Sequence, residues 1–573
     1  MPESLLLNPS TYDPSHFDDE TRRLLKATID WFEDRGLGRL TTDYHAHVFY
    51  AEFLEFAAKE KLFSTFLTPT RDAEGDESKR WDTARVAALS EVLGFYGLNY
   101  WYPWQVTILG LGPVWMSDNE AARRVTAHAL DAGGVAAFGL SEKEHGADIY
   151  ASDLILTPDE YGGYRANGSK YYIGNGNCAT TVSVFGRIEG VEGPDQYVFF
   201  RADSTHPSYH LVKNVVPTQM YVAEFRLDDY PVRAEDILHT GDEAFSAALN
   251  TVNIGKFNLC FGGLGLSTHA FYEAVTHAHN RHLYGKRVTD MPHIRRQLVD
   301  AHARLVGVRL FCDRAIDYFR CANSEDRRYL LYNPVTKMKA TTEAEKVMAL
   351  LADVVAAKAF ESDNYLPIAR VDVSGLPKLE GTVAVNLALI GKFMPAYLFD
   401  PRDLPPIPVR RDATEDDFLF HQGPARGLGK VRFHDWRKAY VTGASIPNVA
   451  RFTEQAESFV ELLVTAAPDA EQMTDMDLML SFGELFTLVV YGQLILEQAE
   501  LLGVEDDLVD AVFDVLVRDF SAQAAELLGK RGSTPAQEDW ARSALRSPVV
   551  DQQRFERLWE QVAGLSGAYT MSP

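Results

Sequence analysis

The stretch DLILTPDEYGGYRANGSKYYIGNG, residues 153–176, is rich in aromatic and β-branched residues and is interrupted by glycine and asparagine. Its two runs flank Tyr161-Gly162-Gly163-Tyr164, where glycine permits the positive φ of a tight turn, so the stretch predicts a β-hairpin. Similar short runs follow, namely TTVSVFGRI, QYVFFRAD and VAEFRLDDYPV. We therefore expect a compact β domain over residues 131–240.

Helical patterns lie on both sides of this domain. Residues 18–36, DDETRRLLKATIDWFEDRG, carry apolar residues at spacings of three and four, as do other segments of the first 130 residues. After Gly241 one stripe steps by four and three along a predicted helix: Ile294, Leu298, Ala301, Leu305, Val308, Cys312, Ala315 and Phe319. Such a seam is typical of a helix bundle. Residues 335–360 predict another long helix, a Pro-rich linker occupies 400–417, and amphipathic helices follow it.

The bulk composition excludes some classes of protein. The chain has 573 residues and a net charge of −25, and it lacks the basic surface that nucleic-acid binding needs. Its four cysteines are too few for a disulfide framework, its start does not resemble a signal peptide, and it has no run of 18 apolar residues. We expect a cytoplasmic protein with no membrane span.

Five motifs in order resemble the acyl-CoA dehydrogenase/acyl-CoA oxidase family. They are GLSEKEHGAD (139–148), YRANGSKYYIGNGNCA (164–179), FRLDDYPVRAEDIL (225–238), NRHLYGK (280–286) and LEGT (379–382). The resemblance implies an α+β fold that is mostly α. Its parts are an N-terminal helical domain (1–130), the central β domain (131–240), a four-helix bundle (241–400) and an extra C-terminal helical domain (401–573).

The resemblance also implies an FAD-dependent oxidoreductase that introduces an α,β double bond into an acyl thioester. Such enzymes need a carboxylate in a dry pocket to remove the α-proton, because desolvation raises its pKa toward neutrality. The usual base of the family is a Glu before Gly-Thr, which matches Glu380-Gly381-Thr382. The position at Asn253–Phe257 that holds the base in other members has no carboxylate here. A simpler interpretation of Glu380 is an acid at a helix start.

The resemblance assigns further residues to the cofactor and the substrate. Arg281 is similar to the family arginine that reaches the FAD pyrophosphate of a neighbouring subunit, which implies a homo-oligomer. A guanidinium suits that role because it binds phosphate with two parallel hydrogen bonds. The other expected cofactor contacts are Ser141, Tyr172, Gly174, Tyr284, Gly381 and Thr382, and the expected substrate contacts are Ala147 and Asp148.

Three positions depart from the family pattern. Gly174 stands where a threonine usually contacts the flavin, Pro292 stands where a glutamine is expected, and KAFESDNY (358–365) replaces a glycine-rich segment. These departures motivate an alternative of a different class, a flavin-free scaffold. Within the dehydrogenase chemistry, the alternatives are an oxidase that uses oxygen instead of an electron-transferring flavoprotein, and a substrate carried on acyl carrier protein instead of CoA.

Other polar clusters receive simpler interpretations. The HxH of DYHAH (43–47) opens a helical pattern and has no partner set downstream, so we expect no metal site. The acids of SEKE (141–144) are most simply solvated side chains.

Overall fold

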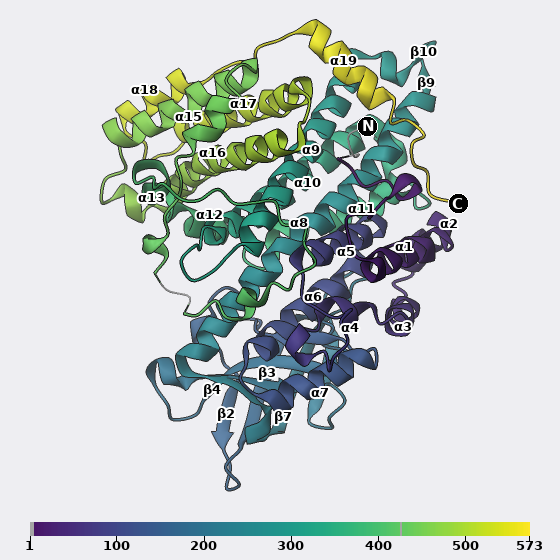
Figure 1. The fold of residues 1–573 in the computed structure, drawn as a ribbon, viewed down its shortest axis with the longest axis vertical. Coiled ribbons are helices and arrows are strands. Elements are labelled where there is room, and N and C mark those ends of the chain that lie inside the picture. Colours follow the sequence, from purple (N-terminus) through teal and green to yellow (C-terminus); the bar gives the residue numbers. More distant parts are fainter. Residues whose placement is uncertain (1–4, 425–426) are drawn as a thin grey trace. The chain divides into compact units, whose positions relative to one another are not determined.

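The computed structural model describes residues 5–424 and 427–573, which fold into two compact units (Figure 1). The sheet unit contains Asp13–Gly265, residues 411–424 and Met571–Pro573. The helical unit contains residues 5–12, Leu266–Arg410 and Gly427–Thr570. This division does not test the boundaries expected near residues 130, 240 and 400, which stay predictions. The expected fold class, mostly α with a central sheet, is confirmed.

The helices at the start of the sheet unit confirm the pattern predicted for the first 130 residues. They are α1 (Asp19–Glu33), α2 (Gly36–His45), α3 (Ala51–Lys59), α4 (Leu62–Leu67), α5 (Thr83–Tyr96), α6 (Leu98–Met116) and α7 (Glu120–Asp131). Asp82 and Asn119 begin α5 and α7 by accepting backbone N–H groups that have no partner within the helix. Helix α6 is buried along nearly its whole length and packs on the first strand of the sheet.

The sheet has eight strands in mixed orientation. They are β1 (Ala136–Gly139), β2 (Ile155–Pro158), β3 (Tyr164–Gly174), β4 (Thr181–Ile188), β5 (Tyr197–Ala202), β6 (Tyr209–Asn214), β7 (Val222–Val232) and β8 (Ile237–Thr240). The order is β6-β7-β3-β2-β4-β5-β8, and β1 pairs in parallel with β4. Antiparallel pairing of Pro158 with Tyr164 closes the predicted hairpin, and Gly162 adopts a φ of +81° in its loop.

Helix α8 (Gly241–Asn280) runs from the sheet unit into the helical unit. It is followed by β9 (His282–Leu283), β10 (Lys286–Arg287), α9 (Pro292–Arg320), α10 (Tyr329–Val355), α11 (Tyr365–Val373), α12 (Val383–Gly391) and α13 (Met394–Phe399). The predicted seam of α9 is confirmed, because all eight of its residues are buried. Helix α10 ends before residue 360, where the sequence analysis placed its end, because Ala356 adopts a left-handed φ of +60° and a 3₁₀ turn follows.

The C-terminal part of the helical unit contains α14 (Arg437–Thr442), α15 (Pro447–Thr465), α16 (Met476–Leu502), α17 (Asp506–Leu528), α18 (Pro535–Ala544) and α19 (Gln552–Ala563). The Pro-rich residues 400–416 form neither helix nor strand, as expected of a linker. Helix α16 is long and apolar enough to cross a membrane, but 83% of its most apolar window is buried inside the protein. That burial is typical of a core helix.

Candidate functional site

Glu380 lies in a tight left-handed turn immediately before α12. Its φ is +51° and that of Gly381 is +89°, while Thr382 caps the helix by accepting the N–H of Val385 at 3.4 Å. The carboxylate therefore stands two residues before the cap, outside the first turn of the helix. The helix-start interpretation is wrong for this reason, because the favourable effect of the helix dipole is confined to that first turn.

The left-handed conformation of Glu380 is costly and needs support. A residue with a Cβ loses roughly 1–2 kcal/mol in this region, and glutamate has no short polar side chain to offset the loss. One of its carboxylate oxygens, Oε2, is shielded from solvent. A general base in a dry site requires such shielding of its carboxylate from water.

Two buried side chains that the sequence analysis did not single out hold this turn. The Lys337 Nζ of α10 donates to the carbonyl oxygens of Pro377 at 2.7 Å and Gly381 at 2.5 Å. The Asn386 Nδ2 of α12 donates to the carbonyl oxygens of Gly381 and Thr382, each at 3.0 Å. No spacing rule of the sequence connects these side chains with Glu380, so pattern reading could not find them.

Ser141 follows β1 in the sheet unit and is tied to the end of β3. Its Oγ donates to the carbonyl oxygen of Tyr171 at 2.8 Å, and its own carbonyl oxygen accepts the N–H of Tyr171 at 2.9 Å. The structure thus brings Ser141 next to the Tyr171-Tyr172 pair. This proximity is what we expect of Ser141 and Tyr172 if both contact the same cofactor. Because the Ser141 hydroxyl donates its proton to Tyr171, its oxygen can only accept a hydrogen bond from a ligand.

A buried ion pair supports the Ser141 turn. The Lys170 Nζ, which is fully buried, donates to Glu142 Oε1 at 2.6 Å and to the carbonyl oxygen of Leu140 at 3.1 Å. Burial lowers the pKa of Lys170 to about 8. Although burial opposes its ionisation, Lys170 helps to hold the pKa of Glu142 below its usual range. The expectation that the SEKE acids are solvated is wrong for Glu142, which is only 5% exposed because it neutralises Lys170.

Tyr172 and Gly174 lie at the irregular end of β3. Tyr172 adopts a φ of +64° within a register shift of the β3–β7 pairing, and its ring is 59% exposed. Gly174 is buried, and a Cβ at this position would approach Val106 Cγ1 to 2.6 Å and Tyr102 Cε1 to 2.7 Å. The missing threonine therefore has a structural reason, since α6 occupies the space that its side chain would need.

The two expected substrate contacts lie on an exposed loop. Ala147 and Asp148 follow the Ser141 turn, and both are exposed. Nearby, Glu142, His145 and Asp153 place ligand atoms within 4.8 Å of one another. Glu142 is already bonded to Lys170, Ser152 and the N–H of Asp153, so this cluster is a set of ion pairs and hydrogen bonds. The expected absence of a metal stays a prediction.

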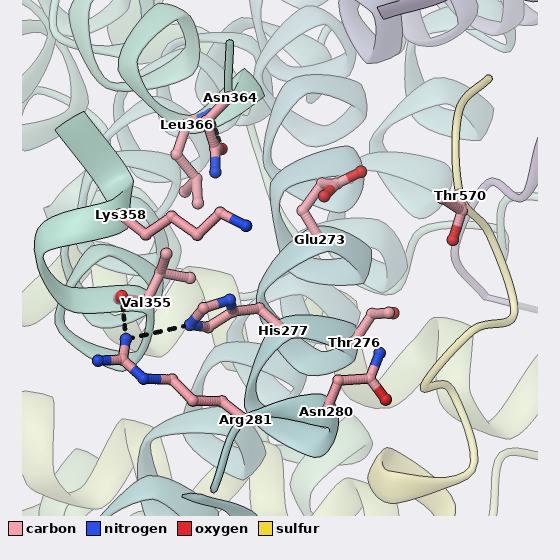
Figure 2. Close-up of a pocket in the computed structure, with 10 residues that line it drawn as sticks. All are labelled: Glu273, Thr276, His277, Asn280, Arg281, Val355, Lys358, Asn364, Leu366 and Thr570. Carbon is pink, nitrogen blue, oxygen red and sulfur yellow. Dashed lines mark hydrogen bonds between the residues drawn. The ribbon is translucent and has the colours of Figure 1, made fainter. Parts of the chain in front are cut away.

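Arg281 lines a cavity of about 340 Å³ in the helical unit (Figure 2). His269, Glu273, His277 and Arg281 follow one another at four-residue steps, which places them along one face of α8 and its end. The Arg281 guanidinium donates to the carbonyl oxygen of Val355 at 3.5 Å and lies 3.4 Å from His277 Nε2. Burial lowers the pKa of His277, with Lys358 and Arg281 adding to the effect, so its neutral ring can accept the arginine N–H.

Lys358 is the first residue of the segment that replaces the glycine-rich motif, and it lines the same cavity. Figure 2 shows its side chain pointing toward the face of α8 that carries Glu273 and His277. Burial raises the pKa of Glu273, while Lys358 acts in the opposite direction. The cavity thus presents two basic side chains and a carboxyl group that burial biases toward its neutral form, which is a suitable set for an anion.

The other departures and the remaining predicted contact have local structural explanations. Pro292 is the first residue of α9, a position that proline favours because its missing N–H would have no partner there. Tyr284 and Gly285, with φ of +53° and +75°, form the two-residue turn between β9 and β10. The Tyr284 side chain is 95% exposed and does not line the cavity, so its cofactor role stays a prediction.

Comparison with known proteins gives these observations a family context. Residues 243–394 match the family model described as "Acyl-CoA dehydrogenase, C-terminal domain". The short-chain specific acyl-CoA dehydrogenase of Megasphaera elsdenii is 23% identical over 380 residues, which is 65% of this chain and 97% of that protein. The chain is therefore similar to the acyl-CoA dehydrogenase family over this C-terminal region and, at low identity, over about two thirds of its length. The matched region of this oxidoreductase family contains Arg281, Tyr284 and the Glu380–Thr382 turn.

Further acyl-CoA dehydrogenases are similar to this chain over different lengths. The rat mitochondrial very long-chain specific enzyme is 22% identical over 313 residues, which is 52% of this chain and 46% of that protein. The crystal structure of the Bacillus anthracis acyl-CoA dehydrogenase complexed with FAD has a TM-score of 0.75 and is 14% identical, with 99% of each chain covered. The fold it shares with this chain therefore includes the C-terminal helices.

Proposed function

We propose that this protein is an FAD-dependent acyl-CoA dehydrogenase in which Glu380 removes the α-proton of an acyl thioester. The observation that carries the proposal is the placement of Glu380 outside the helix, in a left-handed turn held by two buried side chains. An acid that served only to start α12 would not need a strained backbone two residues before the cap. Similarity to the acyl-CoA dehydrogenase family supports the same assignment.

Removal of the α-proton places two requirements on Glu380. The α-proton of a thioester is weakly acidic, so the base must be fixed within hydrogen-bond reach of it and kept from water. The shielded Oε2 supports that role. When bound, the flavin supplies the acceptor for the hydride that leaves the β-carbon. Within the sheet unit, the proposed cofactor contacts are Ser141, Tyr172 and Gly174. The proposed substrate contacts there are Ala147 and Asp148.

The cavity at Arg281 fits the diphosphate of FAD by its donor set. Arg281 offers a planar fork of N–H groups, and Lys358 adds a second positive charge from the segment that lacks the expected glycines. The raised pKa of Glu273 reduces its repulsion of an anion. We propose that these residues hold the diphosphate in place of the missing backbone amides. The relation of this cavity to a neighbouring subunit, the homo-oligomer and the cytoplasmic location remain predictions from the sequence.

Two matched variants separate cofactor binding from chemistry. Glu380→Gln should retain flavin but slow flavin bleaching by a saturated acyl-CoA by at least about 10²-fold, because general-base catalysis contributes about 10²–10⁴-fold. Arg281→Gln should weaken flavin binding about 10-fold or more, because a hydrogen bond to a charged group contributes about 1.5–3 kcal/mol. Stopped-flow absorbance near 450 nm and flavin titration measure the two effects.

Three results of these assays would contradict parts of the proposal. Bleaching of Glu380→Gln at the wild-type rate would remove Glu380 as the base. A wild-type protein that binds no flavin would favour the flavin-free scaffold. The reduced wild-type enzyme should reoxidise slowly in air, because we propose an electron-transferring flavoprotein as the acceptor. Rapid peroxide formation would instead favour the oxidase, and bleaching only by acyl carrier protein thioesters would favour that carrier.

A further inference from the structure

Lys337 is a fully buried lysine whose ammonium group donates hydrogen bonds to backbone carbonyl oxygens. It projects from α10 and donates to the carbonyl oxygens of Pro377 and Gly381, at 2.7 and 2.5 Å. These two carbonyls lie three residues before and one residue after Glu380. The lysine thus holds the backbone both before and after Glu380, the proposed base.

Asn386 provides a second support for the same turn. Its Nδ2 reaches back from α12 to the carbonyl oxygens of Gly381 and Thr382, each at 3.0 Å, and the side chain is fully buried. The carbonyl oxygen of Gly381 therefore accepts hydrogen bonds from two helices, α10 and α12. A carbonyl with two donors from separate elements is fixed in direction as well as in position.

The backbone conformation explains why this turn needs two supports. Glu380 and Gly381 both have positive φ, and glutamate is not among the residues that tolerate this region well. Such a conformation persists only where its surroundings over-determine it. Without the donors at Gly381, the turn could relax toward ordinary φ values, and the carboxylate would move with it.

We propose that Lys337 is a positioning residue for Glu380 and that Asn386 stabilises the same turn. The inference rests on the proposed role of Glu380 as the base. The hydrogen bonds of Lys337 fix the carbonyl groups of Pro377 and Gly381 on either side of Glu380. A positive charge beside this turn favours the ionised carboxylate that can accept a proton. A buried ammonium is expensive, and a neutral donor could have held the same carbonyls, so the charge itself is part of the role.

The decisive variant is Lys337→Met, which keeps an apolar stem of similar length but removes the donors and the charge. Flavin content and the Kd for acyl-CoA, measured by equilibrium titration, should stay within about threefold of wild type. The limiting rate of flavin bleaching should fall about 10- to 100-fold, because an ångström of misplacement can cost about 10²-fold in rate. Amide hydrogen exchange over residues 379–383 should become faster in the flavin-free protein.

Lys339→Met is the matched control. Lys339 lies on the same helix, is also buried, and pairs with Glu343 at 2.7 Å instead of contacting the turn. This variant should lose stability yet bleach at the wild-type rate and keep normal exchange at 379–383. If Lys339→Met slows bleaching as much as Lys337→Met does, the effect is general destabilisation and the proposal is overturned.

Asn386→Ala provides a second, independent test if Lys337→Met does not fold. It should slow bleaching about 3- to 10-fold with unchanged Kd, because it removes one of the two supports of Gly381. Wild-type bleaching and exchange in Asn386→Ala and in any folded Lys337 variant would refute the positioning role. Failure of the proposed function would look different, because wild type itself would not bleach while exchange at 379–383 would still depend on Lys337.

Discussion

At the scale of single residues, close packing explains why position 174 is a glycine and not the threonine expected from the family resemblance. The family usually has a threonine here, whose hydroxyl contacts the flavin. In this chain, Val106 and Tyr102 of α6 lie within 2.7 Å of where a Cβ would stand. Both are buried and cannot swing away easily. The close approach of α6 to β3 therefore excludes the hydroxyl.

We accordingly expect Gly174→Thr to destabilise the protein by about 1–3 kcal/mol, the usual cost of overpacking a core. Gly146→Thr is a control from the same unit, because nothing lies within 4 Å of its Cβ position, and it should change stability by less than about 0.5 kcal/mol. Chemical denaturation of both variants measures the difference. Equal stability of Gly174→Thr and wild type would mean that α6 can yield.

At the scale of elements, a buried charge cluster joins α17 to α9 and α10. Arg304 of α9 donates to both carboxylate oxygens of Asp519 at 2.9 Å and to Glu343 at 2.5 Å. Lys339 and Lys346 of α10 add two further cations to the same carboxylates. Although burial opposes ionisation, the Arg304 hydrogen bonds and the lysines hold the pKa of Asp519 well below its usual range.

The cluster predicts a large cost for Asp519→Asn. Three cations would then share one carboxylate in a mostly buried site, and breaking such a pair costs about 3–5 kcal/mol. Asp477→Asn, which loses an exposed pair with Lys530, should cost less than about 1 kcal/mol. Urea denaturation of the full chain compares the two. If both variants are equally stable, the cluster does not anchor α17.

At the scale of the whole molecule, we expect the stability of the protein in acid to depend on Glu497 of α16. Its carboxylate accepts hydrogen bonds from Arg314 at 2.9 Å and Tyr318 at 3.0 Å, and His434 lies at 3.1 Å. Burial opposes its ionisation, but the His434 and Arg314 contacts outweigh it and lower its pKa to about 2 from the ordinary 4.5. The carboxylate therefore stays ionised in the folded protein at pH values where the unfolded chain takes up a proton.

The resulting stability is fully present above pH 4.5 and is lost as the pH falls toward 2, because the unfolded state binds the proton first. Glu497→Gln should be less stable than wild type by about 3 kcal/mol at pH 7, and this gap should close between pH 4.5 and 2. Thermal denaturation of both proteins across this range measures the gap. A gap that is independent of pH would show that Glu497 titrates normally.

Local patterns in the sequence predicted the order of helical, β and helical segments and the family resemblance, because these depend on residues near one another in the chain. The hairpin at Gly162, the seam of α9 and the Glu380-Gly381-Thr382 motif are local patterns of this kind. The same reasoning placed the candidate base, whose catalytic role stays a prediction.

The contacts that support these residues arise from packing between segments that lie far apart in the chain. Lys337 lies 44 residues from the carbonyl of Gly381 that it holds, Lys170 lies 30 residues from that of Leu140, and Lys358 reaches the cavity of Arg281 from another helix end. Nothing in the sequence near Lys337 and Lys170 indicates that both are fully buried. Burial and hydrogen bonding arise when distant helices and strands pack, and no periodicity along the chain records which carbonyl a buried ammonium will meet.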